Sequence, residues 1–335
     1  MDNDNSEYAR LWRLFVSTGA IMTESREVDR LINVARVDPN LLHTVTAQNF
    51  LQILCSREHL VPQERIVSMF DIFLRSPNFN VNHVDNFGFA LIHYCVQMED
   101  PIFLQMLLEM RRRDIDIDIQ IDTSSWHDGD GLLQRRVTTI TGCTALNLLF
   151  IQTIPRQEKL QLLLDNGASP NIVDHDGFGP IHNLIRNAYC LIETEITDNI
   201  RLLLAPRPPM PNHSNNNNAD PNLRVQGGDE VGFTPLHIAL AKRCQKYVFD
   251  ALLEGGADVS LRNNAGRTPL EYARLLSEPP IHPAILELLW KKGPEFRAMR
   301  LHAERVLWRP THGNRDIYQR ILEEGGMHPR RQPPR

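Results

Sequence analysis

One glycine recurs through the 335-residue chain at nearly regular intervals, and this limits the possible folds more than any other feature. The intervals are 54, 35, 55 and 34 residues, so two lie near 33 and the other two exceed it by 21 and 22. A fixed period of this length predicts a stacked array of repeats, here with insertions in two units. The aligned segments are NFGFALIHYC, ITGCTALNLLF, HDGFGPIHNLI, EVGFTPLHIAL and NAGRTPLEYAR, around Gly88, Gly142, Gly177, Gly232 and Gly266.

The second half of each unit is also similar from unit to unit. It places leucines on one helical face, as in FLQMLLEM, KLQLLLDNGASPN, NIRLLLAP, VFDALLEGGADVS and AILELLWKKG. Each unit is therefore expected to hold a turn and two helices. A single unit cannot bury such an apolar face, whereas a stack of units can.

The clearest unit shows how the residues specify these elements. Gly232 permits the positive φ of a tight turn, and Thr234 is expected to be the N-cap of the helix that follows. Pro235 then occupies the first helical position, where it costs no hydrogen bond. Gly255 or Gly256 ends the second helix in the left-handed conformation.

The motif TPLHIA at 234–239, with the repeated helix ends, resembles the ankyrin repeat family over about residues 80–293. The resemblance implies an all-α solenoid of about six helix–turn–helix repeats with β-hairpins. It also implies a structural role for His237, His93 and His182, which in ankyrin folds tie hairpin backbones together. A metal site is disfavoured because Ala241 occupies the position where a second ligand would lie on the same helix.

We expect five segments along the chain. They are an N-terminal helical cap at 1–45, a degenerate repeat at 46–82, the ankyrin-repeat domain at 83–293, C-terminal helices at 294–325 and a basic flexible tail at 326–335. The two insertions in the repeat domain are expected at about 114–137 and 205–228.

The two insertions differ in composition. In the first, isoleucine alternates with aspartate or glutamine over 114–122, which predicts a strand of a lengthened hairpin. A calcium loop is the alternative, but Ile119 and Ser125 stand where it needs glycine and glutamate. The second insertion is rich in Pro, Asn and Gly, which predicts a disordered loop; its PxxP motifs leave a polyproline ligand as the alternative.

Composition and charge fit a cytoplasmic or nuclear protein. Five widely spaced cysteines, none in a CxxC pair, predict free thiols. No segment is expected to span a membrane. The net charge is −5, but Lys291–Arg335 holds 11 Lys/Arg against 5 Asp/Glu. This leaves a regulator that contacts nucleic acid or a membrane through its basic C-terminus as one alternative function, although the absence of interleaved aromatic residues disfavours nucleic acid.

No sequence motif for a nucleotide, a metal or a catalytic nucleophile is present, so we expect no enzyme activity, no catalytic residues, no metal and no cofactor. The resemblance implies instead a partner-binding concave face of hairpin tips and first helices. Phe89, Phe178 and Phe233 share one slot and could form an exposed aromatic row; the alternative is that each packs on its neighbouring hairpin. The expected binding residues are Phe87, Phe89, Gln97, His175, Asp176, Phe178, Arg186, Glu230, Phe233, Lys242 and Arg267.

The function expected from these features is a monomeric protein–protein interaction module that acts as an adaptor or scaffold for an unidentified protein partner. The substrate-recognition subunit of a ubiquitin ligase is a narrower alternative, although no F-box or SOCS-like segment is recognisable. Asn82 also resembles the ankyrin asparagines that an asparaginyl hydroxylase modifies, with a purely turn-forming role as the alternative.

Overall fold

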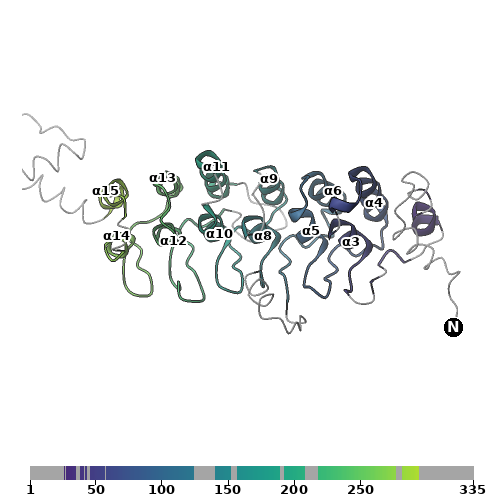
Figure 1. Cartoon of the computed structure of the whole chain (residues 1–335), viewed down its shortest axis with the longest axis horizontal. Coiled ribbons are helices and arrows are strands. Elements are labelled where there is room, and N and C mark those ends of the chain that lie inside the picture. Colours follow the sequence, from purple (N-terminus) through teal and green to yellow (C-terminus); the bar gives the residue numbers. More distant parts are fainter. Residues whose placement is uncertain are drawn as a thin grey trace, which may run out of the picture.

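The protein is a single row of stacked helix pairs, seen in a computed structural model (Figure 1). The structure describes residues 26, 28–34, 38–40, 42–43, 46–56, 58–123, 140–151, 157–188, 192–207, 218–276 and 281–293. The inner helices are α3 (Phe50–Ser56), α5 (Leu91–Gln97), α8 (Ala145–Ile151), α10 (Pro180–Arg186), α12 (Pro235–Ala241) and α14 (Pro269–Ala273). The outer helices are α4 (Gln63–Arg75), α6 (Ile102–Arg111), α9 (Gln157–Asp165), α11 (Glu193–Leu204), α13 (Lys246–Glu254) and α15 (Pro283–Lys292).

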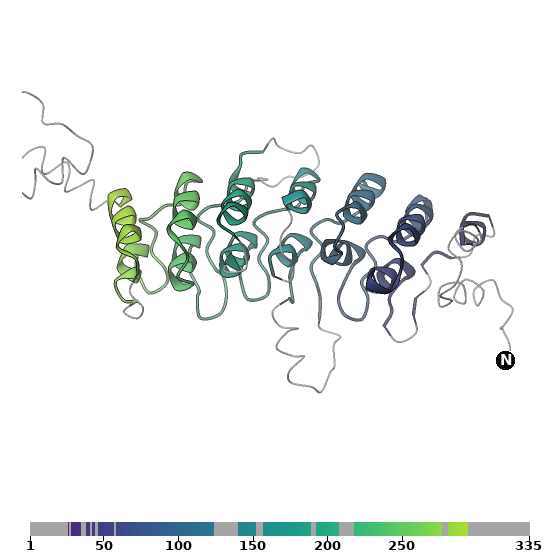
Figure 2. The same cartoon turned by 45° about the horizontal axis from the view of Figure 1, so that its top comes forward.

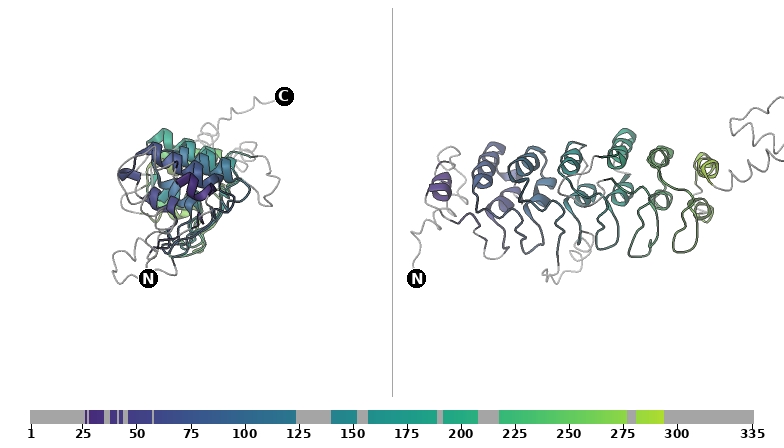
Figure 3. Two further views of the ribbon diagram at one scale, coloured as in Figure 1. Left: turned by 90° about the vertical axis from the view of Figure 1, so that its right-hand side faces the viewer. Right: turned by 180° about the vertical axis from the view of Figure 1, so that it is seen from behind.

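The stack has three parallel layers, formed by the inner helices, the outer helices and the hairpin loops. Each inner helix packs beside the next inner helix, and each outer helix beside the next outer helix (Figure 2). The loops that precede the inner helices project together along one edge, so an end-on view shows helices on one side and hairpins on the other (Figure 3). No strand is assigned in the described ranges. The all-α solenoid expected from the period is confirmed.

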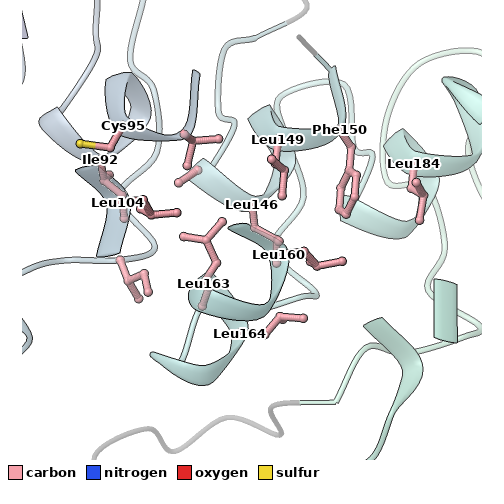
Figure 4. Packing of buried hydrophobic residues seen from close by; sticks show 14 of the residues in the cluster. Ile92, Cys95, Leu104, Leu146, Leu149, Phe150, Leu160, Leu163, Leu164 and Leu184 are labelled. Carbon is pink, nitrogen blue, oxygen red and sulfur yellow. The ribbon is translucent and has the colours of Figure 1, made fainter. Parts of the chain in front are cut away.

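The core runs continuously between the layers. Leu146 and Leu149 on α8 and Leu160 and Leu163 on α9 are fully buried, and they pack together at the centre of the stack (Figure 4). Burial of a leucine side chain contributes about 1.5–3 kcal/mol. Each unit supplies a similar set of buried side chains, so neighbouring units share one core, as the leucine spacing predicts.

The recurring glycine is required by both its backbone angle and its surroundings. Gly88 has φ +82° and Gly177 has φ +83°. A Cβ at Gly88 would overlap the backbone of Asp122 on the next hairpin, and one at Gly177 would overlap the backbone of Gly227. The glycine therefore allows two hairpins to approach closely, in addition to forming the turn.

A ladder of asparagine amides joins the hairpins on their other leg. Asn171 donates its amide N–H to the Asn218 carbonyl at 2.9 Å and accepts the Asp220 N–H at 2.8 Å. Asn82 makes the same two bonds, to the Asp114 carbonyl at 2.7 Å and the Asp116 N–H at 2.8 Å. The side chain of Asn82 is therefore part of the scaffold, and its modification stays an untested prediction.

The strand expected over 114–122 is wrong. Arg111 ends α6, and residues 112–114 and 117–118 form turns. Of the described residues here, only Ile121 exchanges backbone hydrogen bonds across the hairpin: it donates to the Cys143 carbonyl and accepts the Gly142 N–H. Ile117 and Ile121 are both buried, but they belong to separate apolar clusters. The isoleucines alternate in the sequence because both the turn and the hairpin leg direct every second side chain inward. The remainder of this insertion, 124–139, lies outside the described residues.

The disorder expected over 205–228 is wrong for its second half. Residues 218–228 form the leg of the next hairpin, in which Ala219 and Val225 are buried. Composition suggested a loop because turn residues dominate both an insertion and an ordinary hairpin. Residues 208–217, and with them most of the PxxP motifs, lie outside the described part.

The ends of the stack are described in part. A helical turn at Arg30–Val34 lies at the N-terminal end, where Leu31 and Ile32 join the core (Figure 1). Helices α3 and α4, in the segment expected to be a degenerate repeat, pack against α5 and α6. Residues 1–25 and 294–335 lie outside the described ranges, so the predicted cap boundaries, the C-terminal helices and the basic tail stay predictions.

Candidate interaction surface

Three of the inner helices, α5, α10 and α12, each carry one histidine that bonds the helix to the hairpins around it. The Nδ1 atoms of His93, His182 and His237 accept a backbone N–H at the start of their own helix, at 3.0, 3.1 and 3.3 Å. Their Nε2 atoms then donate to a carbonyl of the next hairpin, at 3.0, 2.9 and 3.0 Å. All three rings are fully buried, and this burial lowers the pKa of each to about 4. The expected structural role is confirmed.

Other residue types make the same connection in the degenerate units. Asn147 donates to the Ile172 carbonyl at 3.0 Å, and Gln52 donates to the His83 carbonyl at 3.0 Å. Glu271, in the last unit, instead accepts the Thr268 N–H of its own helix at 2.9 Å. Asn147 and Gln52 thus replace the histidine as the donor to the next hairpin.

The hairpins themselves are shaped by buried acidic side chains. Asp85 accepts the backbone N–H groups of Phe87 and Phe89 at 2.9 and 3.0 Å, and Asp174 accepts that of Phe178 at 2.9 Å. Burial raises the pKa of both carboxyl groups. These bonds fix the backbone from which the expected aromatic row projects.

The three phenylalanines do not form a uniformly exposed row. Phe178 is only 6% exposed, because the Arg186 guanidinium covers its ring at 3.9 Å from the centroid. Phe89 and Phe233 are half-buried; Phe89 packs on Tyr94 at 5.5 Å and Phe233 on Tyr272 at 5.0 Å between centroids. Phe178 is therefore buried by a residue of its own unit and not by the neighbouring hairpin, and Phe89 and Phe233 are partly exposed.

Charged residues expected at the surface are found there. His175, Lys242 and Arg267 are exposed, whereas Asp176 is half-buried. Glu230 lies on a hairpin and pairs with Lys242 at 3.7 Å. In this unit the hairpin and the end of the inner helix thus face each other.

Gln97, at the end of α5, differs from the other expected residues. Its Nε2 is inaccessible to water and has no hydrogen-bond partner in the described chain. An unpaired buried amide is costly to the folded chain. Gln97 lines a hollow of about 540 Å³ together with Tyr94, Glu58 and Glu99.

Sequence reasoning missed several residues of this surface. Tyr94 donates to Asp85 at 2.6 Å and accepts the Gln48 amide N–H at 2.7 Å, and Tyr272 packs edge-to-face against Phe233. Tyr94 and Tyr272 each follow the residue that makes the helix-to-hairpin connection, His93 and Glu271, so their equal spacing was the signal that could have found them. For Gln48 no such signal exists, because the unit that contains it is degenerate.

Within the described ranges, no cluster of three or more His, Cys, Asp or Glu side chains could hold a metal ion. Over the same ranges, no helix combines the length and apolar character needed to cross a bilayer.

Comparison with known proteins agrees with this geometry. The ankyrin repeat family model matches residues 231–264. An ankyrin repeat protein of fowlpox virus (strain NVSL) is 40% identical over 52 residues, which are 16% of this chain and 12% of that relative. Among solved structures, the ankyrin repeat domain of Bcl-3, a member of the IkappaB protein family, superposes with a TM-score of 0.58 at 19% identity, covering 82% of this chain and 96% of that domain.

The fold and its repeated hairpins define a solenoid of the kind that generally serves protein–protein interaction. The chain carries an ankyrin repeat at residues 231–264 and has the fold of ankyrin-repeat domains. It matches only a small part of the length of its curated relative, and the structural likeness concerns the fold alone.

Proposed function

We propose that this protein is an adaptor or scaffold that binds a protein partner through the hairpins and inner helices. The interaction surface consists of Phe87, Phe89, Gln97, His175, Asp176, Arg186, Glu230, Phe233, Lys242 and Arg267. Phe178 lies beneath it as support. The observation that carries the proposal is that exposed or half-exposed side chains of consecutive units stand on a backbone already fixed by hydrogen bonds.

This rigidity matters for affinity. Ordering a loop or a side chain on binding costs free energy, so a surface fixed in advance binds more tightly for the same contacts. Here Asp85 and Asp174 fix the hairpins, and His182 and His237 join them to helices. The half-buried aromatic rings of Phe89 and Phe233 are the kind of anchor that such surfaces use.

The test is affinity capture from cells with the whole chain as bait, followed by mass spectrometry. A variant with H175A, K242A and R267A should lose one or more captured proteins, because these three exposed residues belong to successive hairpins or inner helices. A matched variant, E158A with D198A and K292A on the outer helices, should keep them. If both variants capture the same proteins as the unmodified chain, the proposed surface is not the binding surface.

We further propose a reducing compartment, cytoplasmic or nuclear. Cys55, Cys95, Cys143 and Cys244 are free thiols, and the first three are buried. Burial raises the pKa of Cys55 and Cys143, so both stay protonated and unreactive. Thiol labelling of the protein from its native cells tests this; a disulfide between any two of these cysteines would contradict it.

A further inference from the structure

The last three inner helices each end in a cation. Arg186 is the final residue of α10, Lys242 is the C-cap of α12 and Arg274 is the C-cap of α14. Helix α10 packs beside α12, and α12 beside α14, so these residues form one line, which we name the cationic row. The earlier inner helices α5 and α8 end in the uncharged residues Gln97 and Ile151.

A cation at a helix C-terminus can simply offset the partial negative charge of the last carbonyls. Two of these side chains point elsewhere. The Arg186 guanidinium lies over the Phe178 ring, and Lys242 Nζ lies 3.7 Å from Glu230 on the hairpin. Their charges therefore lie over the interaction surface instead of at the helix ends.

Cations on the hairpins widen this region. Arg224 and Arg267 are exposed, like Arg274, and none of these three makes an ion pair with another described residue. Two of the nearby carboxylates are already engaged: Glu230 pairs with Lys242, and Glu271 pairs with Arg262 at 2.8 Å. Among the described residues, Lys242 therefore has an ion-pair partner, whereas the charges of Arg224, Arg267 and Arg274 are left without one.

The opposite side of the same units is acidic. The exposed cations of outer helices α9, α11 and α13 are Arg201 and Lys246. These helices expose more carboxylates, namely Glu158, Asp165, Glu193, Glu195, Asp198 and Glu254. An acidic molecule is therefore repelled from the outer side and attracted to the inner side. Complementary charge of this kind mainly governs orientation and the rate of association.

We propose that the cationic row binds an extended, acidic segment of the partner protein. The inference rests on the proposed function and adds the chemistry of the partner. Packed helices lie about 8–10 Å apart, and an extended chain advances about 3.3 Å per residue, so successive cations meet every third residue of the segment. The segment thus carries Asp or Glu at positions i, i+3 and i+6.

A nucleic acid fits this surface less well. Asp229 and Glu230 lie at the tip of the hairpin before α12, and Asp176 lies at the tip before α10. A continuous phosphate chain would pass these carboxylates, whereas a peptide can place uncharged residues opposite them.

The experiment is selection of random twelve-residue peptides displayed on phage against the full chain. The unmodified chain should enrich Asp or Glu at every third position. The variant R186E with K242E and R274E should bind those peptides about tenfold or more weakly, because three attractive ion pairs at the surface become repulsive. It should itself enrich Lys or Arg at the same spacing. The helix content of the variant, measured by circular dichroism, should be unchanged because two of these residues are exposed and one is half-buried.

The matched control reverses three exposed cations elsewhere, R112E with R113E and K292E, and should select the same acidic peptides as the unmodified chain. Selection of neutral or basic peptides, or equal selection by both variants, overturns the inference. So does preferential binding of a twelve-nucleotide RNA probe. If the acidic peptides fail while cellular partners are still lost in the interaction-surface variant, the proposed function stands and only the inference falls. Selection of nothing, with no partner lost, counts against both.

Discussion

Mild acid should destabilise this protein through the three histidines that tie helices to hairpins. In His93, His182 and His237, Nδ1 accepts a backbone N–H, so the ring is neutral with its proton on Nε2. A second proton would have to occupy the nitrogen that faces an N–H donor. Burial also disfavours the charged ring, and it lowers each pKa from 6.5 to about 4.

The direction and size of the effect follow from proton linkage. The folded pKa is below the unfolded one, so the unfolded chain binds more protons once the pH falls below about 6.5, and stability is lost down to about pH 4. Between pH 7.5 and 5, one such histidine lowers the free energy of unfolding by about 2 kcal/mol, and three lower it by about 6 kcal/mol. Asp85 and Asp174 act in the opposite direction, because their pKa values are raised by burial and their protonation favours the folded chain.

The assay is urea unfolding at pH 7.5, 6 and 5, followed by helical circular dichroism. His182→Asn copies the residue that the chain uses at Asn147, so it keeps a donor to the neighbouring hairpin but removes the titrating group. It should lower stability at pH 7.5 by about 1 kcal/mol and reduce the loss between pH 7.5 and 5 by about one third. His175→Asn is the control, because this ring is exposed to water in the folded chain.

Two results would refute this reasoning. One is a free energy of unfolding that does not fall between pH 7.5 and 5. The other is a His182→Asn variant with the same pH dependence as the unmodified chain.

Two further predictions concern stability. Asn171→Asp keeps the acceptor for Asp220 but removes the donor to Asn218, so it should cost about 1 kcal/mol in urea unfolding, and an unchanged midpoint would show that the ladder contributes nothing. Phe178→Ala should cost about 3–5 kcal/mol because the ring is buried, whereas Phe89→Ala should cost clearly less; equal losses in thermal melting would contradict the difference in their burial.

Much of the fold follows from a few residues of the chain. Gly232 adopts φ +80° and Gly256 φ +94°, as the turn and the helix end require. Thr234 is the N-cap, but its hydroxyl bonds to His237 Nδ1 at 2.9 Å and not to the helix backbone. The residues at which a helix begins and ends follow from local sequence. The hydrogen-bond partner of a capping side chain depends instead on which atoms tertiary packing brings near it.

The interaction surface was harder to predict for the same reason. The slot shared by Phe89 and Phe178 is a property of the repeat, but exposure within the slot depends on what lies above it. Arg186 covers Phe178, whereas Phe89 packs sideways on Tyr94. Burial of a side chain depends on residues of other elements, and no periodicity within one unit reports it.

The connection between helix and hairpin also has a consequence for cooperativity. His182 and His237 each bond to the following hairpin, so the loss of one unit removes a bond from its neighbour and opening spreads along the row. Among the described residues, Glu271 bonds to its own helix and to Arg262 of its own hairpin, and to no following hairpin. The unit of α14 is therefore expected to be the least stable unit of the described row and to unfold first. Because Arg274 stands on that unit, a partner that engages it would close the loosest end of the array and slow the unfolding of the units behind it.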